Sequence, residues 1–146
     1  YQGTGMGGKF TGLGFLAALL IYLQSLLGGL VGSRWAVHQC LTVNLAQLCT
    51  VLNSHLIGVI PATLTPLLLA FLAWRTAALH PLLRQLASLA GILVSFQVLL
   101  GVATLRLHLQ VEPLTVAHHT VGATLFAILV GFSVLAKREQ QWTTDN

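Results

Sequence analysis

Three histidines, His55, His118 and His119, are the residues best suited to chemistry, because each lies inside a long apolar run. An ionisable side chain at membrane depth is costly, and its default interpretation is a functional site. Neutral imidazole is the commonest metal ligand in proteins, and histidine is a common axial ligand of heme iron. What these three can do depends on how the surrounding runs are arranged.

The composition is that of a membrane protein. Of 146 residues, 55% are hydrophobic and only 7% are charged, and the mean hydropathy is +0.83. A soluble domain carries roughly a quarter charged residues, so this chain is predicted to lie in a lipid bilayer. Its net charge of +4 forms no basic patch with interleaved aromatic residues, which argues against nucleic acid as a partner.

Four apolar runs are each close to the ~20 residues that a bilayer-spanning helix needs. They do not alternate with a period of two, so they are predicted to be helices. We expect an all-α, integral membrane four-helix bundle, up-down-up-down, over residues 10–138, with a flexible lead at 1–9 and a tail at 139–146. Pro61 and Pro66 should be accommodated by neighbouring helices. The runs are Phe10–Val31, Val51–Trp74, Leu86–Leu105 and Leu114–Ala136.

The basic residues predict the orientation. Five of them would lie on the side of the two termini, whereas only Arg34 and Arg106 would lie on the other side. Under the positive-inside rule, the termini are therefore cytoplasmic and loops 33–50 and 106–113 are extracytoplasmic. The five are Lys9, Arg75, Arg84, Lys137 and Arg138.

A short internal repeat supports the bundle. The first run ends "QSLLGGLVGSR" and the third "QVLLGVATLR", while the second opens "HLIGV" and the fourth contains "HTVGA". The first and second helices therefore resemble a copy of the third and fourth.

The histidines fall at matching depths. His55 lies four residues into its run, and His118 and His119 lie four and five residues into theirs, about 6–8 Å below the outer helix ends. Both helices run in the same direction, so two imidazoles can face each other across the core. This geometry predicts one heme b held by His55 and one histidine of the fourth helix. Those two point about 100° apart, so only one binds iron.

Other residues fit the same site. Gly58 and Gly122 lie on the histidine faces and would let a flat macrocycle approach, although contact between helices is the alternative. Arg34 and Arg106 end two helices at the outer level and would bind heme propionates, or serve as snorkelling interfacial anchors. The remaining histidines are interpreted as loop or interface residues: His38, His80 and His108.

Cys40 and Cys49 lie in one extracytoplasmic loop. An oxidising compartment would allow a structural disulfide, which is the interpretation we favour over free thiols or a redox pair. A zinc site is disfavoured because His38 alone does not complete the ligand set.

Several stretches, taken in order, resemble one half of heme A synthase over residues 22–138. They are "NSHLIGV", "FQVLLGVATLRLHLQVEP" and "LTVAHHTVGATLF" with the loop cysteines, and "LVGSRWAVHQC" resembles cyanobacterial-type members. The resemblance implies His55 as the second-helix ligand. Aligning on "VAH" implies His118 as the fourth-helix ligand, with His119 in place of the family's Gln; aligning on the following glycine implies His119 instead.

The resemblance also implies a function. The chain would contribute to oxidation of heme O to heme A in a bacterial plasma or thylakoid membrane, together with a second four-helix half, a homodimer mate or a larger complex. Leu52 stands where the catalytic half has Glu, so the chain is more similar to the half that holds heme b. The alternative is a non-catalytic b-type cytochrome subunit of a respiratory or photosynthetic complex; a quinone-linked carrier with two hemes is less favoured.

Overall fold

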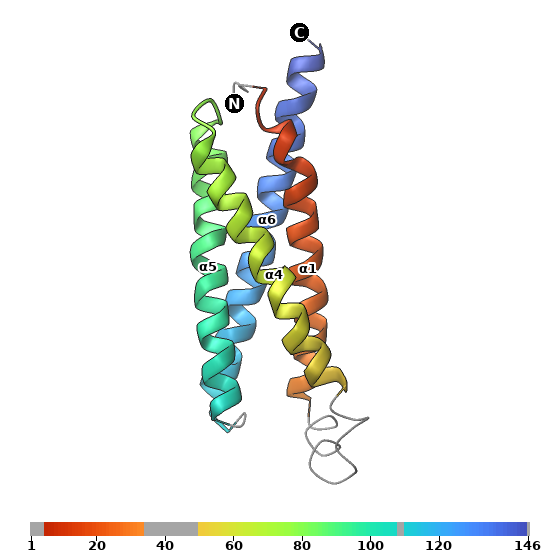
Figure 1. Cartoon of the computed structure of the whole chain (residues 1–146), viewed down its shortest axis with the longest axis vertical. Coiled ribbons are helices and arrows are strands. Elements are labelled where there is room, and N and C mark those ends of the chain that lie inside the picture. The colour runs from red at the N-terminus through yellow and green to blue at the C-terminus, as the bar shows by residue number, and fades with distance from the viewer. Residues whose placement is uncertain (1–4, 34–49, 108–109, 146) are drawn as a thin grey trace.

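The computed structural model describes residues 5–33, 50–107 and 110–145. All regular structure in these ranges is helical, and each helix is long and apolar enough to cross a membrane, so the predicted all-α transmembrane bundle is confirmed. The four helices of the described part are α1 (Gly8–Gly32), α4 (Thr50–Arg75), α5 (Pro81–Arg106) and α6 (Glu112–Asp145), shown in Figure 1.

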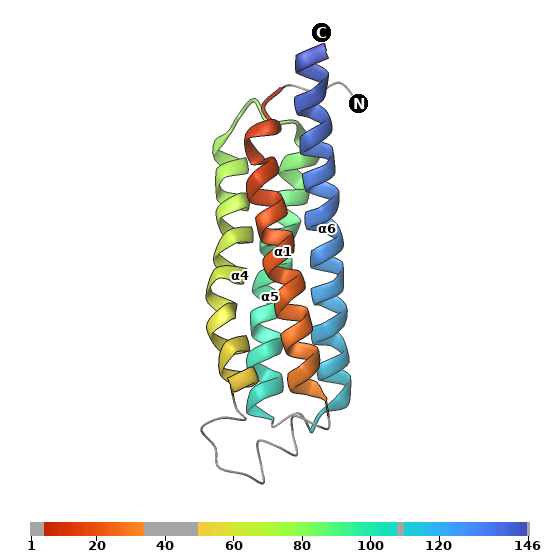
Figure 2. The ribbon, with the colours of Figure 1, turned by 90° about the vertical axis from the view of Figure 1, so that its right-hand side faces the viewer.

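The helices pack as a ring. Both α1 and α5 contact α4 and α6, which leaves α4 and α6 diagonally opposite. Successive helices alternate in direction, and the two ends of the chain lie at the same end of the bundle (Figures 1 and 2). In Figure 1, α4 crosses obliquely, with its first half toward α1 and its second half toward α5.

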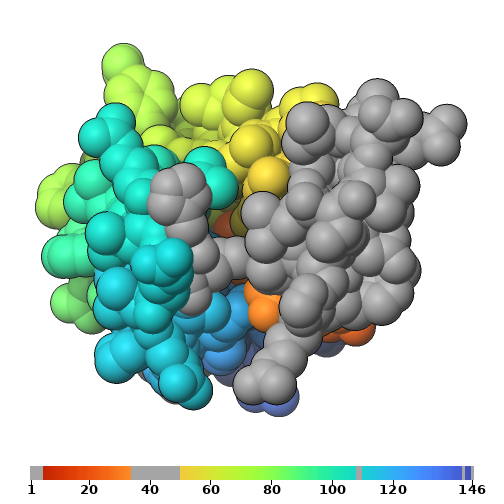
Figure 3. All heavy atoms as spheres, turned by 90° about the horizontal axis from the view of Figure 1, so that it is seen from below, coloured from red at the N-terminus to blue at the C-terminus, as the bar shows by residue number. Residues whose placement is uncertain are grey.

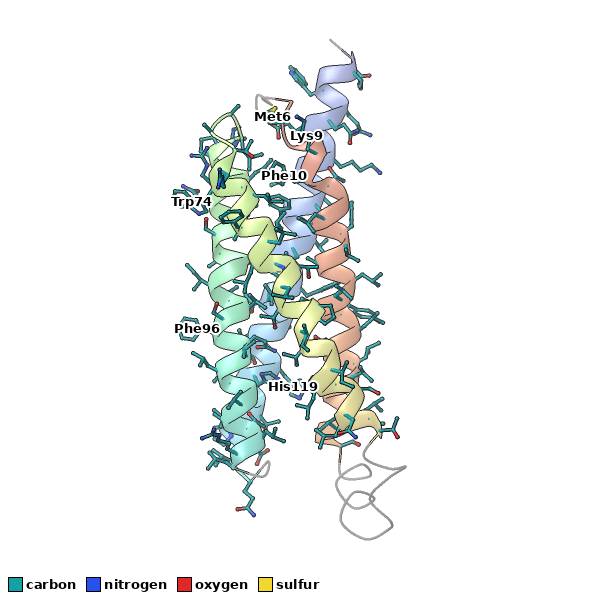
Figure 4. All side chains as sticks on the ribbon, in the orientation of Figure 1. Met6, Lys9, Phe10, Trp74, Phe96 and His119 are labelled. Atoms are coloured by element: carbon teal, nitrogen blue, oxygen red, sulfur yellow. The ribbon has the colours of Figure 1, made fainter. Side chains whose placement is uncertain are left out.

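The core combines small and large apolar side chains. Buried alanines such as Ala17, Ala73 and Ala87 let helices approach closely, as is common in membrane bundles. Phe132 is fully buried between the helices, whereas Phe96 is 56% exposed and points away from the bundle in Figure 4. The exposed apolar side chains suit contact with lipid, where hydrocarbon replaces water.

The start of α5 differs from the sequence prediction. The helix begins at Pro81, whereas the predicted run began at Leu86. Pro81 occupies the first turn, where a missing N–H costs nothing, and the Nδ1 of His80 accepts a hydrogen bond of 3.1 Å from the backbone N–H of Leu82. His80 is therefore a helix cap as well as a residue of the α4–α5 turn.

Arg84 ties this turn together. Its Nη2 donates hydrogen bonds to the backbone carbonyls of Thr76, at 2.9 Å, and Ala77, at 2.8 Å. The guanidinium also lies over the Trp74 ring, 5.9 Å from its centroid. Arg84 thus binds two carbonyls of the turn that follows α4, of which that of Thr76 also accepts a hydrogen bond from the backbone N–H of Leu79.

The last helix is longer than the predicted span. It continues from Ala136 to Asp145, so residues 139–145 of the predicted tail are helical. Glu139 is fully buried and packs against Gly7, where an added Cβ would collide with its carboxylate. The end of α6 and the start of α1 are therefore packed together. Both prolines of α4, Pro61 and Pro66, lie within a continuous helix, as expected.

Candidate functional site

A cavity of about 750 Å³ lies in the half of the bundle away from the termini, lined by residues of all four helices. Its walls are mainly apolar, with Val59, Val94 and Val98 among the lining residues. Seen from that end, the helix ends surround a hollow (Figure 3). The volume is within the range of about 300–1,000 Å³ typical of sites for small molecules and cofactors.

All three candidate histidines line this cavity, His55 from α4 and His118 and His119 from α6. His55 lies five residues after Thr50 and His118 six after Glu112, which is about 8 and 9 Å along each helix. Because α4 and α6 are diagonal, their imidazoles approach the cavity from opposite sides. They are close enough to interact electrostatically, and Figure 4 shows His119 between the helices.

Two of the imidazoles pack in the same way, each against a glycine of a neighbouring helix that we call the seat of the ring. A Cβ added to Gly28 of α1 would lie 3.1 Å from Cε1 of His55, and a Cβ added to Gly101 of α5 would lie 3.1 Å from Cε1 of His118. His119 has a different neighbour, since its Nε2 is 3.7 Å from the Cβ position of Gly32. The structural counterpart of His55 is therefore His118, although the sequence repeat matches "HLIGV" with "HTVGA" and so pairs it with His119.

The two rings have similar surroundings. The His55 ring lies near the backbone of Gln24, and the His118 ring lies near the backbone of Gln97. In both rings, Nδ1 is buried and has no hydrogen-bond partner among the described residues. A buried polar atom without a partner requires an explanation such as an ion, ligand or water.

No family model, curated protein or solved structure matches this chain. The four membrane-spanning helices and the cavity with its three histidines are features of the chain's own structure. What the site can do is therefore argued from its geometry and chemistry.

The two predicted glycines of the site are covered by glutamine side chains. A Cβ on Gly58 would lie 2.6 Å from Oε1 of Gln24, and a Cβ on Gly122 would lie 2.7 Å from Nε2 of Gln97. Gly122 also lines the cavity. Both glycines thus allow close contact with a neighbouring helix, the alternative given with the sequence prediction.

The outer residues divide into described and undescribed ones. Arg106 is the last residue of α5 and is exposed, while at that level Leu105, Gln110 and Thr115 line the cavity. The predicted guanidinium pair and the predicted disulfide stay predictions, because Arg34, Cys40 and Cys49 lie outside the described residues. His38 and His108, which were interpreted as loop or interface residues, also lie outside them.

The cavity wall carries no acidic side chain among its described residues. Leu52, which stands where the family resemblance places a catalytic Glu, lines the cavity. The described residues contain no group of three or more His, Cys, Asp or Glu placed to hold a metal ion. The candidate ligands are two facing imidazoles, a set that suits a macrocycle supplying the other four ligands itself.

Four residues of the site were not singled out from the sequence: Gln24, Gly28, Gln97 and Gly101. The signal for them was present, because each helix pair contributes the same Gln-x-Leu-Leu-Gly pattern. Spacing of four residues places the Gln and the Gly on one helix face. The repeat was used to predict the bundle, but its two polar and small positions were not connected to the histidines.

Proposed function

We propose that this chain binds one heme b inside the membrane, with His55 and His118 as axial ligands. The observation that carries the proposal is the pair of imidazoles on diagonal helices, each packed against a glycine of a neighbouring helix, that line one apolar cavity of about 750 Å³. A bound heme would supply one-electron chemistry, with a potential tuned by its ligands and surroundings.

The chain's own residues would hold and orient that group. The hydrogen bond from Nε2 of Gln24 to the carbonyl of His55, and the packing of the Gln97 amide on Gly122, would hold the two histidine-bearing helices in place, as outer contacts of metal ligands do. The apolar wall would keep water from the iron and lower the local dielectric. Gln110 and Thr115 line the cavity near the helix ends and could donate hydrogen bonds to propionates, together with the proposed guanidinium groups of Arg106 and Arg34.

His119 is the alternative fourth-helix ligand. It lines the cavity and lies beside His118, with ring centroids 6.0 Å apart and ring planes at 52°. His118 is preferred because its ring packs against Gly101 as that of His55 packs against Gly28, whereas His119 is exposed. His119 would then be a neighbour of the heme edge.

The biological role that we propose follows the resemblance to one half of heme A synthase. The chain would contribute to oxidation of heme O to heme A for cytochrome oxidase, beside a second four-helix half, a homodimer mate or a larger complex. Its termini would be cytoplasmic, with a Cys40–Cys49 disulfide in the extracytoplasmic loop of a bacterial plasma or thylakoid membrane protein.

A second candidate is a non-catalytic b-type cytochrome subunit. It is favoured by Leu52 and by the absence of acidic side chains from the described cavity wall. The described wall therefore lacks the Glu that the family resemblance places in the catalytic half. In this role the chain would hold heme b and pass electrons within a membrane complex.

The test is to purify the chain in mild detergent and identify the extracted heme. Heme b with reversible redox behaviour supports the cytochrome role, whereas heme O or A with turnover supports the synthase role. His55→Ala and His118→Ala should each lose heme, while Thr120→Ala, an exposed change on α6, should keep it. If His119→Ala loses heme and His118→Ala keeps it, the ligand register proposed here is wrong.

A further inference from the structure

Two glutamines, Gln24 of α1 and Gln97 of α5, bridge the helices of each pair at the level of the histidines. Each lies four residues before the glycine that seats a ring, Gly28 or Gly101. Each side chain reaches across to the partner helix at the glycine beside its histidine. The arrangement occurs twice in one bundle, which argues against a chance contact.

The first bridge is a hydrogen bond between helices. Nε2 of Gln24 donates a hydrogen bond of 2.7 Å to the backbone carbonyl of His55, and the His55 ring lies near the backbone of Gln24. The Gln24 amide fits only because residue 58 is glycine, since an added Cβ would lie 2.6 Å from Oε1. The backbone of His55 is thus held by the residue that its ring also approaches.

The second bridge resembles the first in part. The His118 ring lies near the backbone of Gln97, and Nε2 of Gln97 lies 2.7 Å from the Cβ position of Gly122. Its Oε1 is buried with no hydrogen-bond partner among the described residues. The Gln97 amide therefore packs on the glycine of the histidine-bearing helix, as the Gln24 amide does, but with its nitrogen rather than its oxygen toward that glycine.

We infer that Gln24 and Gln97 are positioning residues that set the orientation of the His55 and His118 rings. Each glutamine fixes the height of the histidine-bearing helix against its partner, and the seat glycine then fixes where the ring lies. The link to heme rests on the proposed function, but the effect on ring orientation does not. Outer contacts that lock ligand geometry are what make a site precise.

The competing explanation is that the glutamines serve only as polar contacts between helices, a common role in membranes. In that case, their loss would weaken the bundle without changing the histidine rings. The two explanations therefore differ in measurements made at the rings, rather than in stability alone.

The first experiment is a pair of double-mutant cycles. Gly58→Ala should lower the free energy of unfolding because the new methyl group displaces the Gln24 amide. Gln24→Ala in the same chain should restore much of that stability because it vacates the space. The crossed combination, Gly58→Ala with Gln97→Ala, is the matched control and should not restore it. Additive effects in both combinations would overturn the inference, because coupled neighbours are non-additive.

The second experiment reads the rings directly. In heme-free protein labelled with ¹⁵N-histidine, Gln24→Leu should shift the side-chain signal assigned to His55 by His55→Asn, while the exposed change Gln85→Leu should leave it unchanged. If Gln24→Leu lowers stability and leaves that signal in place, the glutamine is only a helix contact and the inference fails. This measurement decides the matter even if the chain binds no heme.

The third measurement uses the heme-loaded chain. Gln24→Leu should reduce heme affinity about fivefold, the effect of one net hydrogen bond, and shift the midpoint potential and low-spin spectrum, with Gln85→Leu unchanged. A colourless wild-type protein contradicts the proposed function but not the positioning role. A coloured protein whose potential and spectrum do not respond to Gln24→Leu contradicts the positioning role but not the proposed function.

Discussion

Gly28→Ala is a small change at the wall of the site that should displace a proposed ligand. The seat of His55 is tight for a methyl group, because the new Cβ would lie 3.1 Å from Cε1, 3.6 Å from Nε2 and 3.8 Å from Nδ1 of the ring. Two carbon atoms prefer a separation of about 3.5–4.0 Å, so the ring must move by about 0.4 Å. The cavity that the ring lines offers space for this movement.

The expected energy is modest. Overpacking costs about 1–3 kcal/mol, while replacing a helical glycine by alanine returns about 0.5–1 kcal/mol. The net loss of about 1 kcal/mol corresponds to roughly a fivefold weaker heme affinity. The displaced ring should also alter the low-spin absorption spectrum.

The matched control is the next residue along the helix. Gly29→Ala meets nothing within 4 Å, so it should keep heme affinity and stability at or slightly above the wild-type values. Heme titration of the two purified variants, followed by the Soret absorbance, provides the comparison. Equal affinities and identical spectra for Gly28→Ala and Gly29→Ala would refute the argument that Gly28 seats a ligand.

Three further predictions concern the bundle. Phe132→Ala, at a fully buried position, should lower the free energy of unfolding by about 3–5 kcal/mol in a detergent unfolding titration, whereas Phe96→Ala at a 56% exposed position should change it by less than about 1 kcal/mol. Gly14→Ala should lower thermal stability, by about 1–3 kcal/mol, because its Cβ would collide with Ser133 of α6; unchanged melting would contradict the α1–α6 packing. His80→Ala should cost about 1 kcal/mol through loss of the cap and speed hydrogen exchange at the start of α5, and unaltered exchange there would contradict the cap.

The helices were predictable because hydropathy alone identifies spans. α1 and α4 begin and end within two residues of the predicted runs, at Gly8 and Gly32 and at Thr50 and Arg75. The start of α5 was predicted five residues late, since Arg84 was taken as a loop residue. In the sequence, an arginine that binds a carbonyl of the preceding turn, as Arg84 does, cannot be told from an arginine that faces water.

The end of α6 shows a different limit. The predicted run ended at Ala136, before Lys137 and Arg138, but a helix does not have to stop where a bilayer does, and it continues to Asp145. Nothing in the sequence indicated that Glu139 would be fully buried, because that depends on how the start of α1 packs over it.

The sequence predicted how far along their helices the candidate histidines lie, but it did not decide between His118 and His119 as the second ligand. Equal depth of His55 and the fourth-helix pair follows from span length alone, and all three histidines do line one cavity. His118 and His119 differ by one residue, which is about 100° of helix rotation, and the short repeat pairs His55 with His119 whereas alignment on "VAH" implies His118. The choice needs the helix phase, which in the structure is given by the seats at Gly28 and Gly101.

The most direct measurement of the central claim is the heme content and coordination of the purified chain, by absorbance and electron paramagnetic resonance. The account predicts one heme per chain, six-coordinate and low-spin in the ferric state, and loss of the low-spin signal in both His55→Ala and His118→Ala. A wild-type protein without a Soret band, or a low-spin signal that persists in His55→Ala, would contradict it.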